Sequence, residues 1–217
     1  DVVDFAEVDM QVPATFVPND PSYGSQWHHP KMSNPTAWDS SLGQGVKVAI
    51  LDTGVDVTHP DLAASVEIGW NTYDNNNNIA DVHGHGTSVA GTAAAIGNNL
   101  VGVSGVAPQA SILAMRISDP SAYAYFSDMA EGVVYAADHG ARVANISYAN
   151  ACGSVTVMNA GDYLRSKGGV LVIAAGNSGG DTGAVASPSL TCVSATDSND
   201  ARTSWSSFGN SVDLSAP

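Results

Sequence analysis

The sequence predicts an α/β fold in three layers, with a mainly parallel sheet and helices on both of its faces. Near-continuous apolar runs, which are typical of strands buried on both faces, occur at residues 46–51, 111–115, 141–146 and 170–174. Segments of helical character lie between these runs. Strands that alternate with helices of this length form βαβ units around a parallel sheet.

The chain before the first strand is expected to be irregular. Prolines break any long helix in residues 1–45. They stand at Pro13, Pro18, Pro21, Pro30 and Pro35.

The helices predicted between the strands are each marked by their composition or by their ends. An alanine-rich helix is expected at residues 87–96. A second helix, at residues 127–139, has Ser127 as its N-cap and Gly140 as its stop. A third, at residues 155–167, ends at a pair of glycines, and a further short strand is expected at residues 192–195.

The composition is that of a globular, acidic protein. Of the 217 residues, 44% are hydrophobic and 13% are charged, and the net charge is −14. This length and composition suffice for one large domain with a core. The acidity argues against a nucleic-acid partner, because a phosphate backbone would repel the chain. It suits a soluble secreted protein or one that binds cations, although solubility alone would also explain it.

The sequence also bears on the compartment. No stretch approaches the roughly 18 apolar residues that cross a bilayer, so no membrane partner is expected. The first residues lack the basic and apolar regions of a signal peptide, so any such signal has been removed, and we expect a secreted, extracellular protein. Cys152 and Cys192 form a disulfide or remain two thiols, and the sequence leaves both open.

The first predicted strand ends at Asp52-Thr53-Gly54, which has three interpretations. An aspartic protease needs a second such triplet in a largely β chain, and the sequence has neither. The aspartate could be structural. A catalytic role requires a histidine partner.

Such a partner occurs in the segment that begins at His83-Gly84-His85. The spacing of the two histidines also suggests zinc, but a zinc site needs three or four protein ligands, and the other histidines show no matching spacing. We therefore expect His85 to act at the start of a helix, paired with Asp52.

Three blocks of the sequence together resemble the subtilase family of serine proteases (peptidase S8), most of all its thermitase branch. They are residues 48–56 with 59–62, residues 84–87 with 89–92, and residues 174–177. The resemblance extends from about residue 17 to residue 217. It implies a subtilisin-like fold and an enzyme that hydrolyses polypeptide substrates.

The resemblance also assigns catalytic roles. His85 would take the proton of a nucleophilic serine, Asp52 would orient the imidazole, and the side chain of Asn177 would stabilise the oxyanion. Asn177 stands before Ser-Gly-Gly, so a simple turn is the alternative. The order Asp, then His, then Ser is that of subtilisin.

Two segments match the family's substrate-binding edges. Ser147, Tyr148 and Ala149 correspond to the border of the primary specificity pocket, where Tyr148 and Ala149 depart from the usual leucine and glycine. The second edge is expected at residues 122–126, which include Ala124 and Phe126. Its aromatic side chains would line a subsite or simply pack.

The resemblance further implies Ca²⁺ as a cofactor. The strong site would use the side chain of Asn99 and carboxylates of Asp20 and Asp61, with the alternative of a Gly/Asn turn beside exposed acids. Its carbonyl ligands would be those of Ile96, Val101 and Val103.

A second, weaker calcium site is suggested by the loop before the catalytic histidine. It would use Asp74 and Asn76, together with Asn71 and Asn78. Asn71 and Asn76 replace aspartates that the family pattern has there, which removes negative charge from the site.

The block with the catalytic serine, Gly-Thr-Ser-Met-Ala in the family, does not occur in the sequence. We expect residues 17–217 to be the catalytic domain up to that block, with the C-terminal part of the fold missing, and residues 1–16 to be a propeptide-like tail or N-terminal extension. The expected partners are the propeptide and a C-terminal fragment of the same protein that supplies the serine.

Three interpretations of the chain remain. It is part of a protease whose serine lies outside it, an inactive fragment, or a peptide-binding protein without catalysis. Intact Asp52, His85 and Asn177 argue against the third, because a protein that had lost catalysis would be expected to have lost these residues. On its own the chain is expected to be inactive and poorly stable.

Overall fold

The computed structural model describes residue 8 and residues 16–217. The propeptide-like tail that the sequence suggests at residues 1–16 therefore lies almost wholly outside the described residues, and it stays a prediction.

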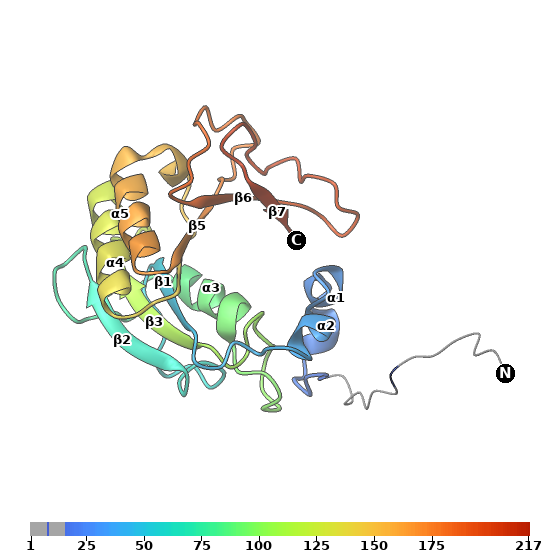
Figure 1. Cartoon of the computed structure of the whole chain (residues 1–217). Coiled ribbons are helices and arrows are strands. Elements are labelled where there is room, and N and C mark those ends of the chain that lie inside the picture. The colour runs from blue at the N-terminus through green and yellow to red at the C-terminus, as the bar shows by residue number, and fades with distance from the viewer. Residues whose placement is uncertain (1–7, 9–15) are drawn as a thin grey trace.

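The described chain forms a seven-stranded, wholly parallel sheet in the order β2-β3-β1-β4-β5-β6-β7. Figure 1 shows α4 and α5 side by side on one face of this sheet and α3 on the other. The predicted three-layer α/β fold is confirmed. The strands are β1 (Lys47–Asp52), β2 (Val66–Asn71), β3 (Ser111–Arg116), β4 (Val143–Ile146), β5 (Val170–Ala174), β6 (Thr191–Ala195) and β7 (Leu214–Ala216).

The longer helices agree with the predicted segments, with small shifts at their ends. They are α3 (His85–Ala94), α4 (Phe126–Asp138) and α5 (Val155–Ser166). Short helices precede the sheet or follow β4, namely η1 (Tyr23–Ser25), α1 (His28–Lys31), α2 (Asn34–Trp38) and η2 (Ala151–Gly153).

Two details of the predicted elements are corrected. Ser127 is not the N-cap of α4, because the helix already begins at Phe126 after an extended Tyr125. The sequence also missed β2, an edge strand in which Glu67 and Ile68 are exposed and Gly69 lies too close to the backbone of β3 for a side chain. Exposed and polar positions on an edge hide the apolar pattern of a strand.

The core has two parts, one on each face of the sheet. Leu51, Met115 and Ile146 pack with α4 and α5, whereas Ile50 and Ile112 pack with α3. Residues of β1 therefore alternate between the two layers, which fixes the register of the strand that ends at Asp52.

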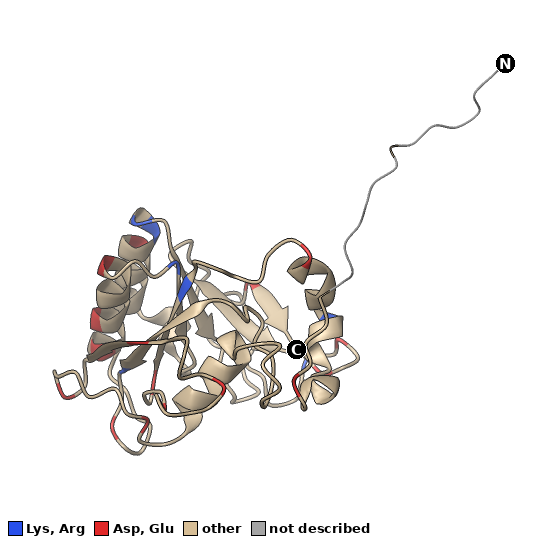
Figure 2. Ribbon diagram, turned by 90° about the horizontal axis from the view of Figure 1, so that it is seen from below, with Lys and Arg blue, Asp and Glu red and all other residues tan. Residues whose placement is uncertain are grey.

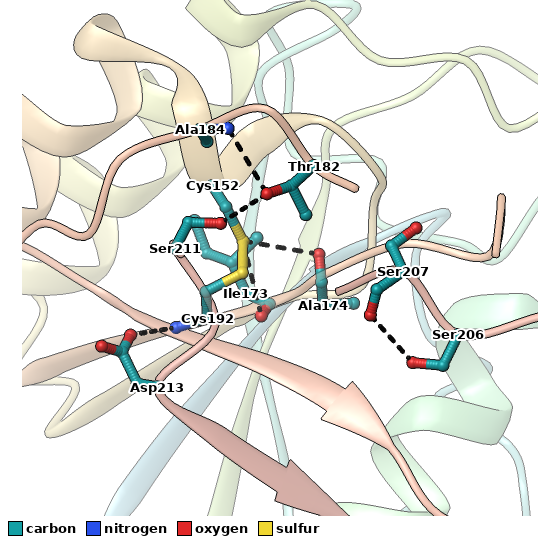
Figure 3. The surroundings of a disulfide bond; sticks show 10 residues. All are labelled: Cys152, Ile173, Ala174, Thr182, Ala184, Cys192, Ser206, Ser207, Ser211 and Asp213. Atoms are coloured by element: carbon teal, nitrogen blue, oxygen red, sulfur yellow. Dashed lines mark hydrogen bonds between the residues drawn. A yellow bond between two sulfur atoms is a disulfide. The ribbon is translucent and has the colours of Figure 1, made fainter. Parts of the chain in front are cut away.

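Cys152 and Cys192 form a disulfide that joins η2 to β6, with Cα atoms 5.9 Å apart (Figure 3). The open question about these residues is thereby answered. Closure of such a loop stabilises the fold by about 4 kcal/mol through the entropy of the unfolded chain. Beside this bond, Asp213 accepts the backbone N–H of Cys192 at 2.9 Å.

Acidic residues outnumber basic ones, 21 to 7, and they are spread over the molecule. Figure 2 shows acidic residues on helices and loops around the described chain, with few basic residues among them. Within the described residues, no helix is both long and apolar enough to cross a membrane.

Candidate active site

Neighbouring strands bring the predicted catalytic and substrate-binding segments to one edge of the sheet. β4 lies between β1 and β5, and all three are parallel. β1 ends at Asp52, β4 is followed by residues 147–149, and β5 is followed by residues 175–177. This is the edge at which open α/β sheets carry their functional side chains.

Asp52 and His85 form a direct hydrogen bond at this edge. Nδ1 of His85 donates to Oδ1 of Asp52 at 2.7 Å, and the backbone N–H of Thr53 donates to the same oxygen at 2.8 Å. Asp52 is fully buried, whereas the His85 side chain is 45% exposed. In the tautomer that donates from Nδ1, Nε2 carries no hydrogen and can accept a proton.

Burial and hydrogen bonding act in opposite directions on the pKa of Asp52. Burial raises the pKa of Asp52, and the hydrogen bond and charge of His85 and the N–H of Thr53 counter that rise. Among the described residues, none hydrogen-bonds the second carboxylate oxygen of Asp52. A buried carboxylate in this position stabilises the imidazolium that forms when His85 accepts a proton.

The first turn of α3 places His85 against the end of β1. A side chain at Gly86 would collide with the carbonyl oxygen of Gly54 and would lie 3.0 Å from Cβ of Asp52. The N–H of Gly86 donates to Oγ1 of Thr53 at 2.9 Å. Glycine at this position therefore allows the close approach that the Asp52–His85 hydrogen bond needs.

Asp81 organises the same turn, although the sequence interpretation missed it. Its carboxylate accepts the hydroxyl of Thr53 at 2.7 Å and the backbone N–H groups of Gly84 and Thr87 at 2.8 and 2.9 Å. Burial alone would raise its pKa, but these hydrogen bonds outweigh burial and lower the pKa of Asp81 to about 2. An aspartate shortly before a helix start is a capping signal that could have identified it.

Tyr148 lies against the catalytic histidine. Its ring meets that of His85 edge-on, with centroids 6.5 Å apart. Its hydroxyl oxygen is buried near the side chain of Ser118, and burial raises the pKa of the phenol to about 12. The departure from leucine at this position thus places a buried polar atom beside the site.

The segment around Ala149 also lies next to the one that carries Asn177. A Cβ at Gly176, which has a φ of +108°, would stand 3.1 Å from Cβ of Ala149. The following Asn177 is exposed. The predicted oxyanion donor therefore lies beside the segment of Ser147, Tyr148 and Ala149, and its role stays a prediction.

The second predicted edge folds as a tight turn. Ala124 bridges to Ser118, and the carboxylate of Asp119 accepts the N–H of Tyr123 at 2.9 Å. Phe126 is the first residue of α4 and is 43% exposed. Tyr123 and Tyr125 are 76% and 69% exposed, and the subsite at this segment stays a prediction.

The residues predicted for the strong calcium site converge. Asp20 and Asp61 are 4% and 1% exposed, although the sequence left open that they were exposed acids. Asp20 accepts backbone N–H groups of the loop at residues 96–103, and Asp61 accepts the N–H of Val103 at 2.9 Å and the side-chain amide of Asn99 at 2.7 Å.

The chemistry of this loop fits a cation. Neither Asp20 nor Asp61 has an ion-pair partner among the described residues, and two buried carboxylates without a counter-charge are costly. No cluster of three or more His, Cys, Asp or Glu side chains suited to a metal occurs in the described part of the chain. Two carboxylates with amide and carbonyl oxygens form the mixed set that calcium accepts. In this structure the amide oxygen of Asn99 accepts the N–H of Val101 at 2.7 Å, so the absence of a cationic partner for the two carboxylates within the described chain is what favours a cation here.

The second predicted calcium site is arranged differently. Asp74 is paired with Arg116 at 3.1 Å, and Asn71 donates its side-chain amide to Asp74 at 3.1 Å. The side-chain oxygen of Asn76 accepts the N–H of Asn78 at 2.8 Å. These residues do not fit a bound divalent cation, because a guanidinium already supplies the positive charge.

Comparisons with known proteins agree with this geometry. The model described as "Subtilase family" matches residues 43–217. Thermitase of Thermoactinomyces vulgaris is 42% identical over 93% of this chain and 74% of its own length. A thermophilic serine proteinase of Bacillus sp. (strain AK1) is 40% identical over the whole of this chain, which spans only 55% of that relative. A solved protease of Pseudoalteromonas arctica PAMC 21717 matches 92% of this chain and 72% of its own, with a TM-score of 0.81 and 30% identity.

Proposed function

The chain belongs to the subtilase family, and we propose on that basis that it supplies the base, its orienting carboxylate and an oxyanion donor to a serine endopeptidase. The observation that carries the proposal is the 2.7 Å hydrogen bond between buried Asp52 and exposed His85. The nucleophilic serine is proposed to come from a segment outside these 217 residues.

In the proposed reaction, Nε2 of His85 takes the proton of the serine hydroxyl as its oxygen attacks the peptide carbonyl. Asp52 holds the imidazole in the required tautomer and stabilises its charged form. His85 then returns the proton to the leaving amine, and the acyl-enzyme is hydrolysed by the same base acting on water.

Asn177 is proposed to stabilise the tetrahedral intermediate. An exposed amide beside the substrate segment can donate to the developing oxyanion. Loss of one such donor costs about 3–4 kcal/mol in subtilisin, a member of the same family.

Polypeptide substrates are proposed to bind as an added strand. The strand would lie between residues 147–149 and residues 122–126, with main-chain hydrogen bonds giving affinity. Tyr148 and the exposed rings near Ala124 would shape the subsites.

The serine segment is proposed to dock beside α3. A groove of about 380 Å³ runs between this helix and the ends of β4 to β7. It presents mainly apolar side chains, which a covering segment would bury. Those that define it best are Val89, Thr92, Val172, Ala174, Val193 and Pro217.

Calcium and secretion complete the proposal. When bound, Ca²⁺ would supply positive charge to Asp20 and Asp61, with the side chain of Asn99 and loop carbonyls as further ligands. The disulfide supports an oxidising, extracellular location. The propeptide is proposed as a further partner.

The test uses a fluorophosphonate probe, which labels an activated serine. The 217-residue chain alone should not be labelled, and adding the segment that contains the serine should restore labelling and peptide hydrolysis. His85→Ala should abolish both, while His139→Ala, which changes an exposed histidine at the end of α4, should not. Stoichiometric labelling of the chain alone, or hydrolysis by the His85→Ala protein, would overturn the proposal.

A further inference from the structure

The loop at residues 71–78 contains one carboxylate and lies beside one buried cation. The carboxylate is that of Asp74, which is 42% exposed. The cation is Arg116, the last residue of β3, whose side chain is only 6% exposed. Nη1 of Arg116 lies 3.1 Å from Oδ2 of Asp74. The charges of the loop therefore cancel within the protein.

Donor groups already contact one of the two carboxylate oxygens of Asp74 and the backbone carbonyl of Asn78. The side-chain amide of Asn71 donates to Oδ2 of Asp74 at 3.1 Å and to the carbonyl of Asn78 at 3.0 Å. Its orientation is fixed, because its own oxygen accepts the N–H of Asp74 at 3.0 Å. A cation at this position would have to displace both the amide and the guanidinium.

The side-chain oxygens of two further asparagines also accept hydrogen bonds from the backbone. Oδ1 of Asn76 accepts the N–H of Asn78 at 2.8 Å, and Oδ1 of Asn78 accepts the N–H of Ala80 at 3.2 Å. The loop is thus closed by its asparagines, which carry no charge. A divalent cation would gain one carboxylate and would face a buried guanidinium, which repels it.

We propose that the guanidinium of Arg116 is the permanent cation of the loop at residues 71–78, so that this loop keeps its conformation without calcium. Among the described residues, the loop at 96–103, which the proposed function assigns to calcium, is then the one calcium-dependent loop. The pair of calcium sites that the family resemblance implies is not present.

Arg116 also connects this loop to the catalytic edge. Its carbonyl accepts the N–H of Thr72 at 2.9 Å, and its Nε donates to the carbonyl of Ser118 at 3.1 Å. It bridges to Thr53, the residue after Asp52. Ser118 in turn pairs with Ala124, so Arg116 is connected through Ser118 to the second predicted substrate edge, and this connection needs no metal.

Calcium titration by calorimetry tests the proposal directly. Asp74→Ala is suitable because it changes an exposed carboxylate, and it should bind the same number of calcium ions as the unmodified protein. Loss of one bound equivalent in Asp74→Ala would overturn the proposal. Absence of binding in both proteins would instead refute the calcium loop at residues 96–103, so the two proposals fail separately.

Hydrogen exchange gives a second readout that does not depend on activity. Removal of calcium should leave the exchange of residues 70–80 unchanged and should accelerate that of residues 95–104. Arg116→Gln should accelerate exchange in residues 70–80, and added calcium should partly reverse this, whereas Arg116→Lys should retain most of the protection. Faster exchange of residues 70–80 in the unmodified protein after calcium removal contradicts the proposal, and so does an Arg116→Gln protein with normal exchange.

Discussion

The loops at residues 71–78 and 96–103 lie before and after α3 in the sequence, and each is bound to carboxylates, its own Asp74 in the first and Asp20 and Asp61 of other segments in the second. The positive charge that balances these carboxylates has a different origin in each loop. At 96–103, Asp20 and Asp61 are almost fully buried, and no cationic side chain of the described chain pairs with them. At 71–78, buried Arg116 pairs with the more exposed Asp74. In one protein, a guanidinium side chain and a proposed bound calcium ion thus each neutralise loop carboxylates, and only the calcium ion can be removed by a chelator.

Of the changes considered, removal of calcium should lower the stability of the protein most, and it should act through the loop at residues 96–103. At a free concentration about 1,000 times the dissociation constant, a bound ion stabilises the fold by about 4 kcal/mol. A chelator should therefore lower the melting temperature of the protein clearly. An unchanged melting temperature would remove the proposed difference between the loops.

The matched control for this measurement is Asp74→Ala. Its melting temperature should fall by the same amount on chelation as that of the unmodified protein, because the altered carboxylate is not proposed to bind calcium. A smaller fall in the variant would show that both loops respond to the ion.

Much of this site could be predicted from sequence, because its parts are local. Asp52 ends an apolar strand, and His85 begins a glycine- and alanine-rich helix, so their chemistry is visible in short segments. The pairing of Arg116 with Asp74 was not visible, because it joins two elements that only the sheet register brings together. The bond between Cys152 and Cys192 was left open for the same reason: sequence gives no distance between Cα atoms.

Loss of the disulfide should be the next largest effect and should not depend on calcium. Replacing Cys152 and Cys192 together by alanine should lower the free energy of unfolding by about 2–4 kcal/mol. The bond joins η2 to β6, neither of which adjoins either loop in the sequence, so its loss and calcium removal should add. Denaturant unfolding of the unmodified protein and of the double variant, each with calcium and with a chelator, measures whether the two losses of unfolding free energy add. A strongly non-additive result would mean that the disulfide also shapes the calcium loop.

Loss of the internal pair should have a smaller effect. Asp74→Ala leaves the buried guanidinium of Arg116 without its partner, which should cost about 1–3 kcal/mol. The cost should be the same in calcium and in chelator. Asp138→Ala, which removes an exposed acid that pairs with Lys167 and accepts the Tyr163 hydroxyl, serves as a control and should cost less than Asp74→Ala. Equal costs for the two variants would contradict the special role of Arg116.

Mild acid should give the smallest difference between the two loops, a difference in the pH at which each loses protection from hydrogen exchange. His28 and His29 lie on the N-terminal segment that packs against the calcium loop, and Nε2 of His29 is 3.0 Å from the carbonyl of Ser104. Burial lowers the pKa of both histidines; at His29 the hydrogen bond to Ser104 opposes this and the charge of His28 adds to it.

Because the folded-state pKa values lie below the unfolded value of about 6.5, the folded protein binds fewer protons in this range. Stability should be complete above about pH 6.5 and should fall as the pH drops below it, by at most about 1.4 kcal/mol per unit for each histidine. The loop at residues 71–78 contains no histidine. Hydrogen exchange between about pH 7.5 and pH 5.5, corrected for the intrinsic rate, should therefore show loosening at residues 95–104 before residues 70–80. Loss of protection in both loops at the same pH would mean that they open together, and the comparison between them would no longer hold.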